Sequence, residues 1–254
     1  MDIQKLEPVL KRIDSCHLAR LWSFYRPAFE SDQRCIDFFS LVFRSEPEDP
    51  AITYDEETDD IVCMTRERVP IQEEAFFPRR MVNCVERLVL AARDMEQIRP
   101  GKDIFKIIYI ITCVESLQLL SGKDLSKAQA VQNFFMDFTS AEDKAFIGER
   151  FSYIEKEGAT SNQNFQYFVR VLNELRNGAA HEGKLWDMCF ASELDDYGQI
   201  FVIDKKIKSK KKREYGFTTY FTYSQFEAIF IRTCIAFIEN YVKEQQEGTP
   251  NAKT

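Results

Sequence analysis

The sequence predicts a mostly α-helical bundle with one or two small β-hairpin insertions. Over most of the chain, apolar residues recur at three- and four-residue spacings, which is the pattern of amphipathic helices that pack against one another. Glycine and proline are scarce, at 9 and 8 of 254 residues, whereas phenylalanine is abundant, at 22 residues. Alternating apolar and polar residues indicate short strands beside the acidic run 55–60 and the basic run 205–213.

The expected elements follow from this periodicity. Pro47 and Pro50 end the helical pattern near the N-terminus, and Pro78 suits the start of the next long helix. Ser140 is expected to cap one helix, and the pair Ser224 and Glu227 is expected to form the capping box of the last one. We expect helices at 3–28, 32–44, 78–97, 103–121, 125–138 and 141–156. A further helix is expected in the segment that leads up to residue 176, and the last one from 224 to about 243. Hairpins are expected within 45–70 and 198–221.

The charge of the chain is unevenly distributed. The formal net charge of −7 argues against a general nucleic-acid coat protein. Residues 46–60 are strongly acidic, however, and the run KKIKSKKKR at 205–213 holds seven positive charges in nine positions. Local fields rather than total charge attract a polyanion, so this run is a predicted polyanion contact, with a solvated hairpin tip as the alternative. Its charged members are Lys205, Lys206, Lys208, Lys210, Lys211, Lys212 and Arg213.

The cysteines and the apolar runs bear on the cellular compartment. The seven cysteines are scattered singly, without a C-x-x-C pair, and most lie in apolar runs, which predicts reduced core residues. The chain does not open with the charged segment and following apolar segment of a secretory signal. The longest apolar stretch, Ile107–Val114, is too short to span a bilayer. The acidic run lacks the glycine and terminal glutamate of an EF-hand, so no metal site is expected. We therefore expect a cytoplasmic protein without a membrane partner, metal or cofactor.

The most informative stretch is VLNELRNGAAHEGKLW at 171–186. An apolar stripe leads into Arg176 and Asn177, and His181 follows four residues after Asn177, so on a continuing helix the last two share a face. Arginine can bind a phosphate with two parallel hydrogen bonds, and histidine can move a proton near neutral pH. The other histidine of the chain, His17, lies among apolar residues and is expected to be a core or boundary residue.

The residues Arg176-Asn177-x-x-x-His181 resemble the signature of the HEPN superfamily, in which a histidine follows an arginine by four to six positions. The resemblance implies a compact helical bundle and, in many members, a metal-independent endoribonuclease of toxin–antitoxin or antiphage systems. It implies residues 73–246 as the HEPN-like bundle, with 1–72 as an N-terminal helical region of unassigned role and 247–254 as a loose tail. It also implies RNA as the substrate, a homodimer with a composite cleft, and an antitoxin or regulatory protein as a further partner.

The chemistry gives each predicted site residue a role. RNA transphosphorylation needs a base for the 2′-hydroxyl, an acid for the leaving 5′-oxygen and charge stabilisation at phosphorus. His181 would serve as acid or base, Arg176 would stabilise the phosphate, and Asn177 would orient the site. Glu115 lies in the most apolar helix of the chain, where a lone carboxylate needs a partner. The resemblance implies that a polar residue on a neighbouring helix can support the motif, and Glu115 is the candidate for that role.

Other interpretations of the motif are open at the level of sequence. Arg176 and His181 can both simply favour a helix C-terminus, where cations complement the macrodipole. The fold can also be retained without catalysis, as a nucleotide- or RNA-binding module. A third possibility is a helical interaction protein in which the motif is coincidental.

Overall fold

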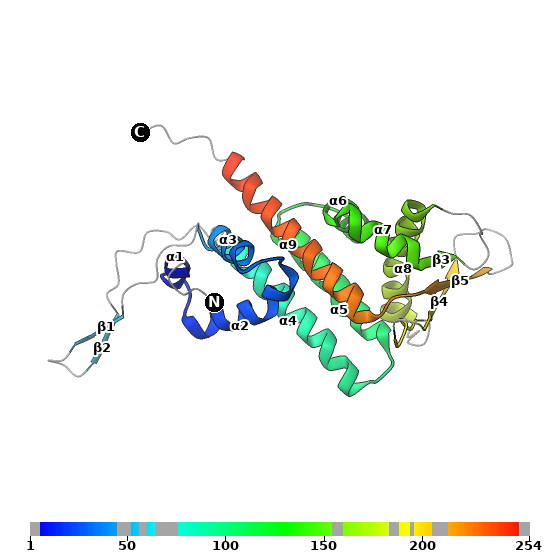
Figure 1. The fold of residues 1–254 in the computed structure, drawn as a ribbon, viewed down its shortest axis with the longest axis horizontal. Coiled ribbons are helices and arrows are strands. Elements are labelled where there is room, and N and C mark those ends of the chain that lie inside the picture. Colours follow the sequence, from blue (N-terminus) through cyan, green and yellow to red (C-terminus); the bar gives the residue numbers. More distant parts are fainter. Residues whose placement is uncertain are drawn as a thin grey trace. The chain divides into compact units, whose positions relative to one another are not determined.

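The computed structural model describes residues 6–44, 52–55, 60–63, 76–153, 160–182, 188–193, 196–204 and 213–248, and it is mostly helical (Figure 1). This confirms the predicted fold class at that level. The first half of the chain contains α1 (Glu7–Leu10), α2 (Ser15–Tyr25), the 3-10 helix η2 (Arg26–Ala28), α3 (Asp32–Val42), α4 (Phe77–Ile98) and α5 (Asp103–Leu120). The second half contains α6 (Lys127–Phe138), α7 (Ala141–Arg150), α8 (Ser161–Glu182) and α9 (Tyr223–Gly248).

Within the described residues, two antiparallel sheets accompany the helices. The strands β1 (Ile52–Asp55) and β2 (Asp60–Cys63) pair with each other, which confirms the predicted hairpin around the acidic run. The strands β3 (Phe151–Tyr153), β4 (Gly198–Asp204) and β5 (Arg213–Thr219) form a second sheet with β5 in the middle. In this sheet Gly198 pairs with Thr219 and Asp204 pairs with Arg213, so the basic run joins the far ends of β4 and β5.

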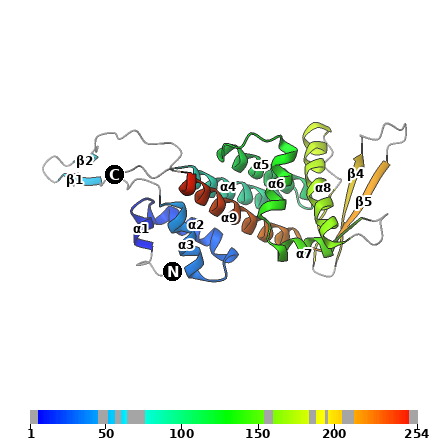
Figure 2. The ribbon, with the colours of Figure 1, turned by 90° about the horizontal axis from the view of Figure 1, so that it is seen from above.

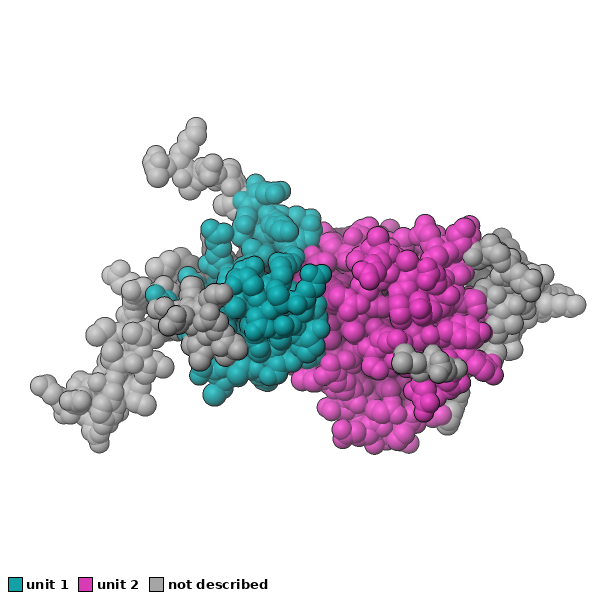
Figure 3. Space-filling model, in the orientation of Figure 1, with its two compact units in different colours: residues 1–83, 238–254 teal, residues 84–237 magenta. Residues whose placement is uncertain are grey.

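The chain divides into two compact units (Figure 3). Unit 1 comprises residues 1–83 and 238–254, and unit 2 comprises residues 84–237. Both divisions fall within helices, α4 and α9, rather than in connecting loops. The domain boundaries expected at 72 and 246 stay a prediction.

Unit 1 has an aromatic core. Tyr25, Phe38 and Phe39 are fully buried, and the hydroxyl of Tyr25 donates to the carbonyl of Val82 at 2.8 Å, so this buried polar group is satisfied. His17 is half-buried, and its Nε2 lies 2.8 Å from Oδ1 of Asn83. This confirms the expectation that His17 is a satisfied boundary residue.

Unit 2 is built around α8, which packs against α5, α6 and α7 (Figure 2). Its centre is a cluster of phenylalanines that are nearly inaccessible to solvent, and each such side chain contributes about 1.5–3 kcal/mol by leaving water. The rings of Phe168 and Phe226, from α8 and α9, lie 5.3 Å apart in an edge-on contact. The cluster comprises Phe134, Phe135, Phe165, Phe168, Phe221, Phe226 and Phe230.

The sequence pattern is overridden at two points, once by a local helix cap and once by a tertiary contact. The single helix expected over 3–28 is wrong, because Asp14 begins a new helix by accepting a hydrogen bond from the amide of His17 at 2.8 Å. The helix expected over 141–156 ends at Arg150, and the next residues form β3. There Phe151 stacks on Phe217 of β5 with a centroid distance of 5.1 Å, a sheet contact that the local helical pattern does not reveal.

The helix caps give one confirmation and one correction. Ser140 caps α7 as predicted, since its hydroxyl accepts from the amide of Asp143 at 3.0 Å. The predicted box of Ser224 and Glu227 is wrong. Thr222 caps α9 instead, because its hydroxyl accepts from the amide of Gln225 at 3.3 Å while the Gln225 side chain accepts from the amide of Thr222 at 2.9 Å.

The cysteines in the described part of the chain are free thiols. Cys35, Cys113 and Cys234 are buried as expected, whereas Cys16 and Cys189 are exposed, so the core assignment is wrong for these two. Within the described ranges, no helix combines the length and apolar character that crossing a bilayer requires.

Candidate functional site

The helix that carries the motif is α8, and its apolar stripe fixes which way the motif faces. The helix starts after Thr160, whose hydroxyl accepts from the amide of Gln163 at 3.4 Å. Phe165, Phe168 and Leu172 are fully buried, and Leu175 is 4 % exposed. The buried stripe therefore reaches the residue that directly precedes Arg176, which places the arginine at the edge of the core.

Arg176 of α8 contacts Glu115 of α5, a residue that lies 61 positions earlier in the chain. The Nη2 group of Arg176 donates to Oε2 of Glu115 at 3.0 Å, and Oε1 of the same carboxylate lies 2.8 Å from Nη2. Oε1 is buried without a well-aligned hydrogen bond, so we assign the hydrogen bond to Oε2 and treat the Oε1 contact as purely electrostatic. The two side chains are 14 % and 22 % exposed, so solvent screens this pair less than a surface ion pair.

Asn177 completes the contacts that the structure gives Arg176. The Nη1 group of the arginine donates to Oδ1 of Asn177 at 3.1 Å. Two of the three nitrogens of the guanidinium group are thus held, by an adjacent amide and by a carboxylate from another helix. A guanidinium group has five N–H donors in a fixed plane, so orienting two nitrogens fixes the directions of all of them.

The backbone of His181 belongs to the last turn of α8, which continues through Glu182. The helix therefore runs unbroken from Arg176 through His181, and positions 177 and 181 lie on one face, as four residues make slightly more than one turn. The side chain of His181 lies outside the described part of the structure. The structure thus brings together Arg176, Asn177 and Glu115, and it places His181 by its backbone alone.

The predicted contact run at 205–213 is only partly within the described residues. Lys205, Lys206, Lys208, Lys210, Lys211 and Lys212 lie outside them, and Arg213 is described by its backbone as the first residue of β5. Its role in binding a polyanion stays a prediction. Within the described ranges, no group of three or more histidine, cysteine, aspartate or glutamate side chains is placed to hold a metal ion.

A second polar cluster on α5 was not singled out from the sequence. Lys106 is 6 % exposed, and its ammonium group lies 2.8 Å from Oδ1 of Asp103 and also contacts Glu96 of α4. Burial disfavours the lysine charge, but the two carboxylates outweigh it and raise the pKa of Lys106. The other carboxylate oxygen of Asp103 accepts from the amide of Phe190 at 2.7 Å. A lysine within the most apolar helix was the available signal, because such a charge needs a buried partner.

Comparisons of this chain with models of protein families, with curated proteins and with solved structures found no match.

Proposed function

We propose that the protein is a metal-independent endoribonuclease of the HEPN type that acts on RNA in the cytoplasm. The observation that carries the proposal is the contact between Arg176 and Glu115. It holds the arginine of the motif in a defined orientation five residues before His181 on the same helix. Phosphodiester transfer requires at least charge stabilisation and a proton carrier, which are the roles proposed for Arg176 and His181.

In the proposed reaction, the 2′-hydroxyl of a ribose attacks the adjacent phosphorus and the bond to the 5′-oxygen breaks. A base removes the proton of the 2′-hydroxyl, and an acid supplies a proton to the departing 5′-oxygen. His181 performs the proton transfer, and Arg176 stabilises the negative charge that accumulates on the phosphoryl oxygens. Glu115 and Asn177 orient Arg176. The products are a 2′,3′-cyclic phosphate and a free 5′-hydroxyl.

The proposal includes a homodimer. One His181 cannot readily serve as base and acid in the same turnover. The only other histidine of the sequence is His17, whose ring is hydrogen-bonded to the side chain of Asn83. A two-fold axis near the end of α8 would bring a second His181 and a second Arg176 into one cleft. The biological role that fits is a toxin or antiphage effector held in check by an antitoxin or regulatory protein.

A second candidate function is a non-catalytic module that binds RNA, a nucleotide or another protein. It is favoured by the same contact, because Glu115 already compensates the charge of Arg176. A phosphate would then bind through the remaining N–H groups of Arg176 or displace Glu115. In this case the ion pair stabilises the packing of α5 on α8 and has no part in a reaction.

The deciding experiment incubates the purified full chain with labelled single-stranded RNA in EDTA. Cleavage that yields a 2′,3′-cyclic phosphate, and is lost in Arg176→Ala, supports the nuclease. The matched control is Arg232→Ala, which also breaks an ion pair between a guanidinium group and a carboxylate, that of Asp143. Binding without cleavage supports the non-catalytic module. If the protein neither binds nor cleaves RNA, both RNA-directed functions are rejected, and a protein-interaction role remains.

A further inference from the structure

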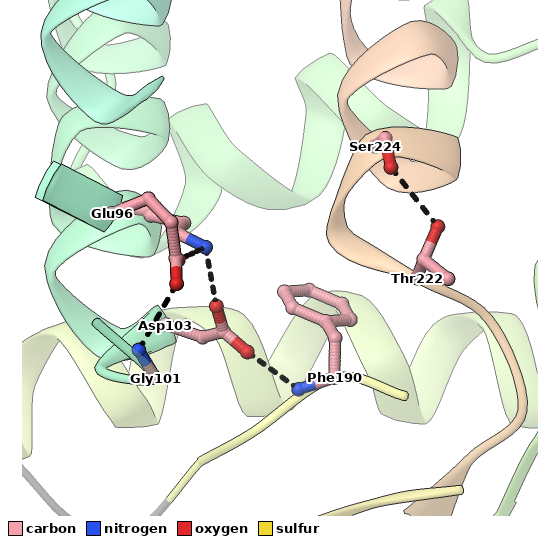
Figure 4. A network of polar contacts seen from close by, with 7 residues as sticks. Glu96, Gly101, Asp103, Phe190, Thr222 and Ser224 are labelled. Carbon is pink, nitrogen blue, oxygen red and sulfur yellow. Dashed lines mark hydrogen bonds and ion pairs between the residues drawn. The ribbon is translucent and has the colours of Figure 1, made fainter. Parts of the chain in front are cut away.

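The chain that leaves the motif helix returns to α5 within a few residues. The last residue of α8 is Glu182, and Phe190 follows it by eight positions. The amide of Phe190 donates to Oδ2 of Asp103 at 2.7 Å, as Figure 4 shows. Because the acceptor is a carboxylate, this hydrogen bond is stronger than one between neutral groups.

Asp103 is held firmly in this role. It is 7 % exposed, and its second oxygen accepts from the ammonium group of Lys106 at 2.8 Å. The same ammonium group contacts Glu96 and lies 4.7 Å from the centroid of the Tyr223 ring. An isolated buried carboxylate would be costly, but this one has an ion-pair partner on one side and a backbone donor on the other.

The rest of the exit segment 188–191 is held by neutral contacts. The amide of Cys189 donates to the carbonyl of Gln199 at 3.0 Å, and the amide of Ala191 donates to the carbonyl of Phe221 at 3.2 Å. The ring of Phe190 stacks on that of Phe226 at 5.6 Å. These contacts attach the segment to β4 and to the start of α9, so the fold does not depend on Asp103 alone.

We propose that Asp103 is a positioning residue of the candidate site, which restrains the end of α8 at His181 by holding the exit segment at Phe190. The proposal rests on the proposed function in treating residues 176–181 as a site. The last turn of a helix frays unless the following chain is tied down, because its final carbonyls lack partners within the helix. Because Phe190 is fixed, fewer conformations of the chain are compatible with a frayed end of α8.

On this inference α5 restrains the site at two points. Glu115 orients the arginine, and Asp103, twelve residues earlier on the same helix, limits the motion of the histidine end. Twelve residues correspond to roughly 18 Å along a helix, so one rigid element holds both Arg176 and, farther along it, Phe190 of the exit segment. The restraint is expressed in the geometry of His181 rather than in contact with the substrate.

The test uses the full chain without RNA. In Asp103→Ala, hydrogen exchange of the amides at 178–182 and at 188–191 should rise about tenfold to a hundredfold, which corresponds to the loss of a hydrogen bond to a charged group. The titration of His181, followed by NMR with carbon-13-labelled histidine, should also shift. His17→Gln assigns the signal, because the chain has only these two histidines.

Asp143→Ala is the matched control, because Asp143 is likewise 7 % exposed and paired with a cation, Arg232, and has no contact with Phe190 among those that the structure gives it. Asp103→Leu, which is similar in shape and removes both acceptor oxygens, supplies the same comparison if the alanine variant does not fold. Faster exchange at 188–191 alone, with an unchanged His181 titration, would overturn the proposal. Equal effects in the Asp143 variant would overturn it as well. A wild-type protein that cleaves no RNA would reject the nuclease but leave this result intact.

Discussion

Oε2 of Glu115 accepts a hydrogen bond from Nη2 of Arg176 at 3.0 Å, across a sequence separation of 61 residues. The contact joins the most apolar helix of the chain to the helix that carries the motif. It gives the half-buried Glu115 carboxylate an ion-pair partner, and it gives the arginine a fixed orientation. The direction in which the arginine points therefore depends on a residue of another helix, and a change at either position should affect both.

The first prediction compares the only two histidines of the chain. His181→Ala should lower RNA cleavage by about a hundredfold or more, as expected for a proton-transfer group. His17→Ala removes a half-buried side chain that is hydrogen-bonded to Asn83, and it should leave the cleavage rate unchanged. Single-turnover cleavage in EDTA measures both. Equal rates for the two variants would remove His181 from the mechanism.

The second prediction concerns the coupling of Glu115 and Arg176. A double-mutant cycle with Glu115→Ala and Arg176→Ala should give a coupling free energy of about 1–3 kcal/mol in denaturant unfolding, because the pair is mostly shielded from water. Glu115→Gln should reduce cleavage, since the neutral side chain orients Arg176 less firmly. A coupling near zero would mean that the pair is not formed in solution.

The third prediction concerns the basic run 205–213. Replacing Lys208, Lys210, Lys211 and Lys212 by glutamine should weaken RNA binding and flatten its dependence on salt, because fewer counterions are released on binding. The chemical step at saturating RNA should change little. Fluorescence anisotropy at low and at physiological salt measures both affinity and slope. The same affinity and slope in the quadruple variant would assign the run to a solvated hairpin tip.

The fourth prediction concerns the dimer. Specific activity should fall when the protein is diluted below its dimer dissociation constant, because one chain offers a single His181. If the composite cleft needs one intact copy of each group, mixing His181→Ala with Arg176→Ala protein should restore part of the activity. If it needs both histidines, the mixture stays inactive while the dilution effect persists. Sedimentation as a monomer at full specific activity contradicts the dimer.

The fifth prediction is a pH dependence of stability. The hydrogen bond from Lys106 is the largest influence that lowers the pKa of Glu96 below its ordinary value of 4.5. A carboxylate with a lowered pKa in the folded state stabilises the protein above its unfolded-state pKa, and the contribution disappears as the pH falls through the folded value. Glu96→Gln should therefore be less stable than the wild type at neutral pH and approach it at a pH below the folded pKa. Thermal unfolding at the two pH values measures the difference, and a constant difference would contradict the assignment.

Much of the helical architecture follows from the sequence because it depends on local periodicity. The helices expected at 78–97, 103–121 and 125–138 match α4, α5 and α6 to within about two residues. The misses arise partly from distant residues and partly from local caps that the periodicity does not single out. Phe151 leaves the helical pattern because β5 offers it a pairing edge, and Thr222 caps α9 because its side chain and that of Gln225 satisfy each other's amides.

The candidate site follows from the sequence in a similar way. Glu115 stands out because a carboxylate in an apolar helix needs a partner, and it is the expected support of the motif, although periodicity alone does not identify Arg176 as that partner. Asp103 and Lys106 are three residues apart and match an ordinary surface pair on a helix. Their burial, and the contact of Asp103 with Phe190, depend on where the chain returns after α8, which local patterns do not specify.

The division of the chain within α4 and α9 determines where it can be shortened. A fragment cut at residues 84 and 237 would remove the first seven residues of α4 and the last eleven of α9, and would expose helix interiors as new ends. A fragment that begins before Phe77 and extends through Gly248 keeps both helices whole. Truncations meant to isolate the motif helix for crystallisation or binding assays should therefore follow the helix ends rather than the borders of the compact units.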